Sequence, residues 1–356
     1  MKRLPDIKKI NRVVVRGTNW VGDAAMSVPA LRELRRILPE AHITLCTRPF
    51  ASGIFADADF LDDILLFERE KSGVKTVFKQ AKIWRKREFN LAILFQNAFQ
   101  AALLARLGKA KHRIGYRTDA RSFLLTNALT VPEWKNNRHE VFYYLNIVAE
   151  LETLLRGATD VWKHEPDIGL RVSETRKDAA REILRSNGVD SSKKIVALCA
   201  GSINSRAKRW QASSYAELAD LIHARLNADI VLIGSPDELE VSKEVYALAK
   251  FKPILLTGKT SLAEAVAVLS IVDLLVTNDT GPAHIAPALS TKTIVIFGPT
   301  IPDTTRPFSN LAQIIRKPPA CAPCMLRDCP IDHRCMTAIS ATEVFDEVTK
   351  VLNVNG

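Results

Sequence analysis

Apolar strand patterns alternate with amphipathic helix patterns along almost the whole chain, and this alternation constrains the fold more than any other feature. It is typical of parallel α/β sheets, in which helices connect neighbouring strands. The expected strands are residues 12–17, 42–47, 63–67, 91–96, 112–116, 194–200, 229–234, 254–256, 274–277 and 293–297. The expected helices are residues 23–37, 74–87, 98–107, 139–155, 174–187, 213–227, 237–249, 261–270, 282–289 and 342–352.

The length and the position of an irregular stretch indicate two domains. The chain has 356 residues, about twice a typical domain of ~150 residues. A polar stretch at 157–169 separates the two sets of strands and is predicted to be a linker. We therefore expect two Rossmann-like, doubly wound domains, residues 1–165 and 166–356, which face each other across a cleft. The second would carry a Cys-rich segment at 321–335 and end in the C-terminal helix.

Two of the strand-to-helix turns suit an anionic ligand. Val13–Leu38 leads from an apolar strand through a Gly-containing loop into a helix, and Val276–Leu289 repeats this order, with Pro282 opening its helix. A helix N-terminus offers free backbone N–H groups and the positive end of the helix dipole to a phosphate. His284 lies one turn into the second helix. An ordinary structural connection is the alternative for the second turn, and the first turn lacks the G-x-G-x-x-G fingerprint.

A third loop, Ala200–Trp210, follows an apolar strand and combines small hydroxyl residues with the cations Arg206, Lys208 and Arg209. Hydroxyl groups, backbone donors and fixed positive charge are what a diphosphate needs. The loop also follows the carboxyl end of its strand, where open α/β sheets bind ligands. A solvated basic loop is the alternative.

Two further features each allow a functional and a structural interpretation. Asp23 follows Gly22 at a helix start, where it could act as a general base or as an ordinary N-cap or first-turn acid. Arg113, Arg117 and Arg121 gather near the end of the fifth strand, either as a wall that recognises an acidic acceptor or as a solvated edge.

The net charge of +11 indicates anionic partners. A nucleic-acid-binding protein is disfavoured because few aromatic residues interleave the basic patches. A nicotinamide oxidoreductase is disfavoured because the fingerprint glycines and the acid beyond them are missing. A P-loop is excluded separately, because Thr257–Thr260 lacks the motif's first glycine. We find neither a secretory signal nor a membrane span, so we expect a cytoplasmic protein.

Four cysteines, Cys321, Cys324, Cys329 and Cys335, lie within fifteen residues and beyond the last expected strand. Structural zinc, reduced or redox-active thiols and disulfides are all possible; the spacing is not a common zinc pattern. A structural role is expected, away from both ligand-binding loops. Cys46 and Cys199 lie in strands and are expected in the core.

Several of these segments together resemble the ADP-heptose:lipopolysaccharide heptosyltransferases of glycosyltransferase family 9, most closely the heptosyltransferase II branch. The matching segments are Arg16–Asp23, Arg113–Tyr116, Gly258–Leu262, Thr277–His284, Cys321–Cys324 and Arg327–Met336. Pro287 departs from the pattern, because it is expected to interrupt the helix after His284.

This resemblance implies a GT-B fold and inverting, metal-independent transfer of heptose from ADP-heptose to the lipopolysaccharide inner core. The acceptor would be a Kdo-containing lipid A that carries one heptose, and the enzyme would work at the anionic inner-membrane surface with no cofactor beyond a possible structural zinc. Alternatives are heptosyltransferase I or another family 9 core transferase and, more remotely, a nucleotide-binding protein without transferase activity.

The resemblance also implies site residues in both domains. Asp23 matches the catalytic base, and Lys208 would stabilise the departing diphosphate. The expected donor-binding residues are Ser202, Ser205, Arg206, Asp279, Thr280, Gly281 and His284. The expected acceptor-binding residues are Asn19, Trp20, Arg113, Arg117 and Arg121.

Overall fold

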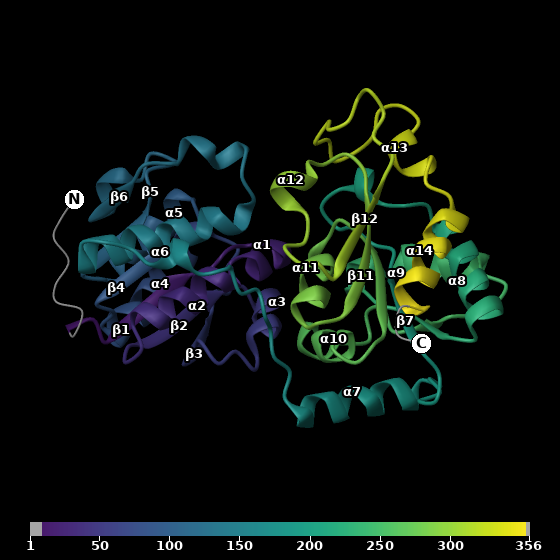
Figure 1. Ribbon diagram of the computed structural model, residues 1–356. Coiled ribbons are helices and arrows are strands. Elements are labelled where there is room, and N and C mark those ends of the chain that lie inside the picture. The colour runs from purple at the N-terminus through teal and green to yellow at the C-terminus, as the bar shows by residue number, and fades with distance from the viewer. Residues whose placement is uncertain (1–8, 354–356) are drawn as a thin grey trace. The chain divides into compact units, whose positions relative to one another are not determined.

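The computed structural model describes residues 9–353, and the chain divides into two compact units, Met1–Ile168 and Gly169–Gly356. The division falls close to the expected boundary after residue 165. Each unit is a parallel six-stranded sheet with helices on its faces (Figure 1). The extreme ends of the two expected domains, residues 1–8 and 354–356, lie outside the described residues.

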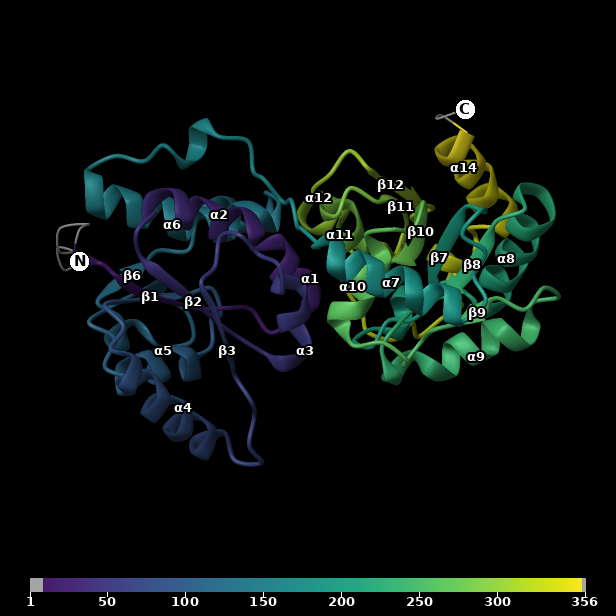
Figure 2. The same cartoon turned by 90° about the horizontal axis from the view of Figure 1, so that it is seen from below.

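The sheet of the N-terminal unit has the strand order β3-β2-β1-β4-β5-β6. Its strands are β1 Arg12–Arg16, β2 His42–Thr47, β3 Asp63–Leu66, β4 Leu91–Leu94, β5 His112–Tyr116 and β6 Asn127–Leu129. Its α-helices are α1 Val21–Met26, α2 Val28–Ile37, α3 Pro49–Ser52, α4 Gly73–Arg87, α5 Phe99–Leu107 and α6 Glu140–Arg156. Helices α2 and α6 cover one face of the sheet, and α4 and α5 cover the other (Figure 2).

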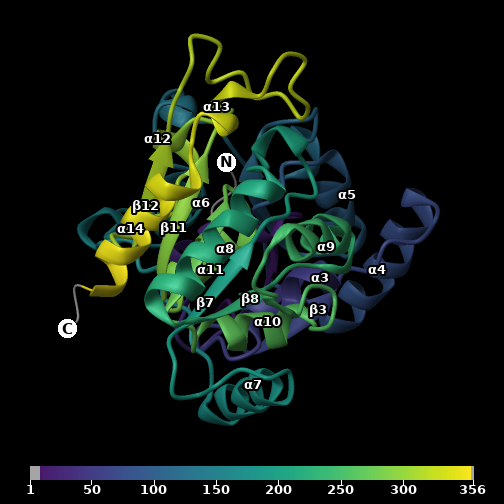
Figure 3. The same cartoon turned by 90° about the vertical axis from the view of Figure 1, so that its right-hand side faces the viewer.

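The sheet of the C-terminal unit has the order β9-β8-β7-β10-β11-β12. Its strands are β7 Ile195–Cys199, β8 Asp229–Leu232, β9 Ile254–Leu255, β10 Leu274–Asn278, β11 Lys292–Phe297 and β12 Ala312–Arg316. Its α-helices are α7 Glu174–Ser186, α8 Ala212–Leu226, α9 Leu239–Leu248, α10 Leu262–Leu269, α11 Gly281–Ala288, α12 Pro302–Thr305, α13 Arg334–Thr337 and α14 Ala341–Asn353. Helix α8 packs against both α9 and α14 (Figure 3), and α10 packs against α7 and α11.

Both sheets have the 3-2-1-4-5-6 order of a doubly wound Rossmann fold, so the fold class predicted from the sequence is confirmed. The apolar runs explain why these segments form central strands. Val13, Val14 and Val15 in β1 are all 0% exposed, because helices cover both faces of the sheet. Cys46 and Cys199 are buried in β2 and β7, as expected.

The elements differ from expectation in several places, and the short helices α3, α12 and α13 are among those not predicted. The helix expected at 23–37 is two helices, interrupted at Ser27, because Pro29 near the start of α2 cannot donate an amide hydrogen bond to a preceding turn. The edge strands β6 and β12 were not predicted. Helix α11 continues through Pro287 to Ala288, so the expected interruption there is wrong. No helix within residues 9–353 is long and apolar enough to cross a membrane.

Candidate functional site

Asp23 lies in the first turn of α1, two residues after that helix begins at Val21. The N-cap position belongs to Trp20, so Asp23 is not the N-cap residue. The carboxylate of Asp23 instead accepts a hydrogen bond from the hydroxyl of Tyr144 in α6. A buried phenol therefore holds the side chain expected to act as a base.

Tyr144 is 5% exposed, and the pKa of its hydroxyl is raised well above the ordinary value by burial and then by the negative charge of Asp23. The phenol thus stays protonated and remains a hydrogen-bond donor to the carboxylate. Sequence analysis missed this residue. No local motif marks it, because the two residues are brought together by the packing of α1 on α6.

The loop between β1 and α1 is held by Arg16, which is 1% exposed. Its guanidinium donates hydrogen bonds to the carbonyl of Gly17 at 2.6 Å and to Asn19 Oδ1 at 3.2 Å, and burial lowers the pKa of Arg16 to about 10. The Asn19 side chain is therefore fixed from inside the protein. The adjacent Trp20 is 51% exposed and can meet a ligand.

Two of the three arginines expected to bind the acceptor are structural. Arg113 is 7% exposed and donates to the carbonyls of Leu124 at 2.7 Å and Ala110 at 2.6 Å. Arg121 is 0% exposed and donates to the carbonyl of Tyr116 at 2.9 Å, to that of Gln96 and to Asn97 Oδ1 at 3.1 Å. The guanidinium groups of Arg113 and Arg121 donate to backbone carbonyl groups that would otherwise be buried without hydrogen-bond partners. Neither arginine is therefore exposed to bind an acceptor.

Arg117, the third of these arginines, is exposed. It stays a candidate for contact with an acceptor.

In the C-terminal unit, Lys208 and Asp279 form an ion pair at the carboxyl edge of the sheet. The Nζ of Lys208 lies 2.6 Å from Asp279 Oδ2 and 3.2 Å from the backbone carbonyl of Asp279. Thr300 Oγ1 donates a further hydrogen bond of 2.7 Å to the same carboxylate oxygen. Asp279 is 4% exposed, whereas the Lys208 side chain is 26% exposed, so the lysine is held in place but can reach solvent.

The turn after β10 is built on Asn278, which is 0% exposed. Its side chain donates to the carbonyls of Ala200 and Gly201 and accepts hydrogen bonds from Trp210 N–H and the Tyr215 hydroxyl. This side chain therefore connects the turn before α11 to the loop after β7. The two loops predicted to bind a diphosphate lie together at one edge of the sheet.

The other expected donor residues are divided between the two loops. Thr280 is the N-cap residue of α11, Gly281 begins that helix, and the buried His284 lies one turn further on. Ser202 is 3% exposed, and its carbonyl accepts two hydrogen bonds from Arg209 at 3.0 and 3.1 Å.

The Cys-rich segment packs directly on the loop after β7, so the expectation that it lies away from both loops is wrong. Ser205 Oγ donates to the carbonyls of Leu326 at 3.3 Å and Arg327 at 3.2 Å, and Ala207 N–H donates to the latter at 2.9 Å. Arg206 forms an ion pair of 2.6 Å with Asp328. These contacts occupy the side chains of Ser205 and Arg206, which were expected at the donor.

One contact comes from His333, whose Nε2 lies 2.6 Å from the carbonyl oxygen of Ala207. Ala207 and Lys208 belong to the same short 3₁₀ turn, Arg206–Lys208. Through this hydrogen bond, His333 holds the backbone turn from which the Lys208 side chain extends. We did not predict this role, because the histidine and the turn are far apart in sequence.

The four cysteines of the segment are free thiols. Burial and then the three neighbouring thiols raise the pKa of Cys335. Within residues 9–353, no three His, Cys, Asp or Glu side chains are grouped as a metal site requires. The zinc hypothesis thus gains no support from the structure. The segment contacts the β7 loop, the carbonyl of Pro299 through Met325 N–H and, at Cys335, the hydrophobic core.

Glu238 is a further buried carboxylate that sequence analysis overlooked. It follows β8, the second strand of its sheet, and a Cβ atom on Gly201 would lie 2.1 Å from Glu238 Oε1. Its Oε2 accepts hydrogen bonds from Ser235 N at 2.9 Å and Ser235 Oγ at 3.0 Å. In Rossmann domains an acid after the second strand binds ribose. Glu238 is therefore a candidate contact for ribose, although no G-x-G-x-x-G fingerprint precedes it.

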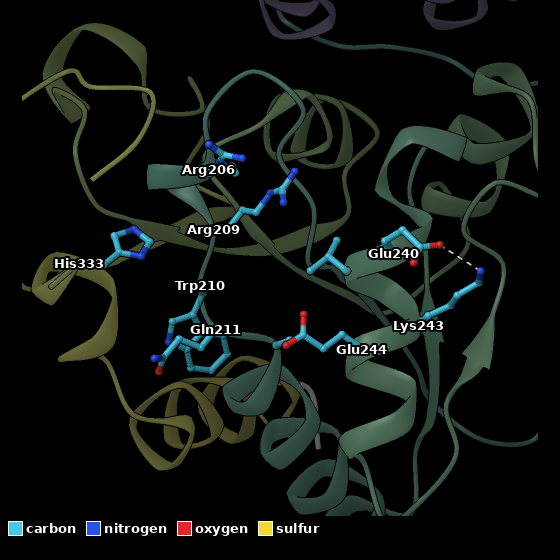
Figure 4. A pocket seen from close by; sticks show the side chains of 10 residues that line it. Arg206, Arg209, Trp210, Gln211, Glu240, Lys243, Glu244 and His333 are labelled. Atoms are coloured by element: carbon cyan, nitrogen blue, oxygen red, sulfur yellow. Dashed lines mark hydrogen bonds and ion pairs between the residues drawn. The ribbon is translucent and has the colours of Figure 1, made fainter. Parts of the chain in front are cut away.

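A cavity of about 670 Å³ lies beside the β7 loop, between that loop, α9 and His333 (Figure 4). Cations and acids both line it, including Arg206, Arg209, Lys243 and Glu244. Neither Lys208 nor Asp279 lines this cavity, so it is adjacent to the ion pair rather than built around it.

Comparison with known proteins gives one family. The model of glycosyltransferase family 9 (heptosyltransferase) matches residues 77–334. The lipooligosaccharide heptosyltransferase 2 of Campylobacter jejuni is 26% identical over 348 residues, which are 96% of this chain and 99% of that protein. The lipopolysaccharide heptosyltransferase 2 of Salmonella typhimurium is 27% identical over 322 residues, 86% of this chain and 88% of that protein.

Among solved structures, the Escherichia coli ADP-heptose lipopolysaccharide heptosyltransferase II has the same fold. It aligns with a TM-score of 0.82 at 24% identity, over 97% of this chain and 99% of that one. The predicted GT-B fold class is thereby confirmed.

Proposed function

This chain belongs to glycosyltransferase family 9, and from that premise we propose that it transfers a heptose from ADP-heptose to the lipopolysaccharide inner core. The acceptor we propose already carries one heptose on a Kdo-containing lipid A, since the relatives named above are heptosyltransferases 2. The observation that carries the proposal is the buried Lys208–Asp279 pair beside the first turn of α11.

The ion pair suits the departure of ADP. As the bond to the sugar breaks, negative charge grows on the diphosphate, and a preorganised cation stabilises that charge more in the transition state than in the ground state. Asp279 and the carbonyl beside it hold the Lys208 ammonium in place before the donor binds. We propose that Lys208 and the N–H groups at the start of α11 stabilise the leaving group without a metal ion.

Asp23 is proposed as the general base. In inverting transfer the acceptor oxygen attacks the anomeric carbon from the side opposite ADP, and one base takes its proton. The carboxylate of Asp23 has this capacity, and the Tyr144 hydroxyl fixes its orientation. Because attack is from the rear, a β-linked donor gives an α-linked product.

The remaining contacts are proposed from position and charge. Glu238 would accept a hydrogen bond from a ribose hydroxyl of ADP, as acids after the second strand do in Rossmann domains. Exposed Trp20 and Arg117 would meet the acceptor on the N-terminal unit.

A chain with net charge +11 would also be attracted to the anionic membrane that holds a lipid-linked acceptor. That attraction should weaken as salt rises. Liposome co-sedimentation unaffected by salt would count against it.

The test is a transfer assay with ADP-heptose and two acceptors, Kdo-lipid A with and without one heptose. We expect transfer to the heptose-bearing acceptor, an α-linked product by NMR, and activity that persists in EDTA. Transfer only to the acceptor without heptose would assign the chain to the heptosyltransferase I reaction. Transfer to neither would contradict the proposal.

A further inference from the structure

A second cavity lies in the N-terminal unit, between α6 and the segment that follows it. Its volume is about 470 Å³, within the range of about 300–1,000 Å³ found for small-molecule sites. Trp134, Arg138, Phe142, Asn146, Trp162 and Glu165 are among its lining residues. Aromatic rings and a few polar groups thus converge on one space.

Arg138 stands inside this group of rings. Its guanidinium carbon lies 3.6 Å from the ring centroid of Phe142, 5.3 Å from that of Trp134 and 5.4 Å from that of Trp162. Cation–π contacts of this kind hold a guanidinium without neutralising it. The rings therefore fix the position of a full positive charge.

Within residues 9–353, no hydrogen bond or ion pair satisfies this guanidinium. Burial lowers the pKa of Arg138. The buried arginines of this unit, Arg16, Arg113 and Arg121, donate to carbonyl oxygens, and Lys135, near Arg138, pairs with Glu140 at 2.5 Å. A partly buried guanidinium with its donors open indicates an anionic ligand, because its fork matches a carboxylate or a phosphate.

The remaining lining groups suit a sugar ring. Trp162 is 42% exposed, so its ring is available to a ligand. The electron-rich face of an indole attracts the weakly positive C–H edge of a pyranose. Asn146 and Glu165 add amide and carboxylate groups that hydrogen-bond to hydroxyls. Glu165 is exposed, so solvent and salt screen its repulsion of an anion.

We propose that this cavity binds an acidic sugar, that is, a sugar ring bearing a carboxylate or a phosphate group. Arg138 binds the anionic group, and Trp162 packs against the ring. Asn146 accepts or donates hydrogen bonds at the sugar hydroxyls, and Glu165 accepts them. Helix α6 also carries Tyr144, the partner of Asp23, so the cavity and the proposed base share one helix. The identification of this sugar as part of the acceptor rests on the proposed function; the binding itself does not.

The test measures binding to the full-length chain by calorimetry and tryptophan fluorescence, with four probes: glucuronate, glucose 6-phosphate, glucose and inorganic phosphate. We expect at least one sugar acid to bind about tenfold or more tightly than both glucose and phosphate. Arg138→Gln should weaken that binding by about tenfold or more, since a charge-assisted contact is lost. Trp162→Ala should weaken it while leaving the preference between the acids unchanged.

The matched control is Arg106→Gln, which removes an exposed cation of the same unit from helix α5 and should bind as the wild type does. Arg138→Lys keeps the charge but not the fork and should be intermediate. No binding of either acid, inorganic phosphate binding as tightly as the sugar acids, or equal affinities in Arg138→Gln and wild type would each overturn the proposal. No probe contains ADP-heptose, so failure of heptose transfer would leave this result unaffected. Whichever acid binds identifies the group that Arg138 recognises.

Discussion

The ion pair between Lys208 and Asp279 should be strongly coupled, and the pair between Arg206 and Asp328 should not, although both have an N–O separation of 2.6 Å. They differ in burial. The side chains of the first pair are 26% and 4% exposed, and those of the second are 74% and 58% exposed. The two pairs therefore form a matched comparison within one unit.

The expected magnitude follows from distance and burial. Two unit charges 2.6 Å apart attract by about 6 kcal/mol at an effective dielectric of about 20. Desolvation of the Asp279 carboxylate offsets several kcal/mol of this. We expect a net coupling of about 2–3 kcal/mol for the buried pair and below about 1 kcal/mol for the exposed pair.

The assay is a double-mutant cycle for each pair, from urea unfolding of the full-length chain followed by circular dichroism and by fluorescence. The variants are Lys208→Met, Asp279→Asn and their combination, with Arg206→Met, Asp328→Asn and their combination as the control cycle. Thr300→Val removes a hydrogen bond to the charged Asp279 carboxylate without changing the charge of either ion-pair partner, and it should cost about 1.5–3 kcal/mol. Equal coupling energies in the two cycles would refute the reasoning from burial.

Three further predictions concern single residues. Tyr144→Phe removes a hydrogen bond to the charged form of Asp23, the proposed base, so the acid limb of the kcat–pH profile should move up by about one pH unit. An unchanged acid limb would show that Tyr144 does not affect the proton transfer. His333→Ala should lower kcat about tenfold with ADP affinity little changed, because one hydrogen bond holding the Lys208 turn is lost. His333→Gln should restore part of the lost kcat. Equal kcat in His333→Ala and wild type would contradict this prediction. A hydrogen bond from Lys317, followed by one from Ser340 N–H, lowers the pKa of Glu343 to about 2. The contribution of Glu343 to folding stability is therefore fully present above the unfolded pKa of about 4.3 and is lost as pH falls towards 2. Glu343→Gln should therefore cost about 0.5–1 kcal/mol at pH 7 in this exposed setting, with the difference shrinking below about pH 4; a difference independent of pH would contradict the linkage.

Much of the fold could be predicted from the sequence because central parallel strands are continuous apolar runs. β1 and β10 are examples, with every residue of β10 buried. The edge strands β6 and β12 were not predictable by that signal. β12 is half exposed and polar at Gln313 and Arg316, so its pattern is that of a loop.

The candidate site was predictable only where its residues belong to local motifs. Lys208 and Asp279 lie in two loops that the strand pattern places at one sheet edge, and the structure joins them. Tyr144 and His333 could not be found this way, because each acts on a residue brought near by packing. Arg113 and Arg121 were misassigned for a related reason: sequence shows a cation but not which carbonyl groups surround it.

The most direct test of heptose transfer by base catalysis is Asp23→Asn, measured as kcat for transfer from ADP-heptose to the heptose-bearing acceptor. Asparagine keeps the size of the side chain and can still accept the Tyr144 hydrogen bond, but it cannot take the acceptor proton. We expect kcat to fall by about 10²–10⁴, while the Kd for ADP stays near the wild-type value because the proposed donor site is in the C-terminal unit. A folded Asp23→Asn enzyme with nearly full kcat would contradict the account.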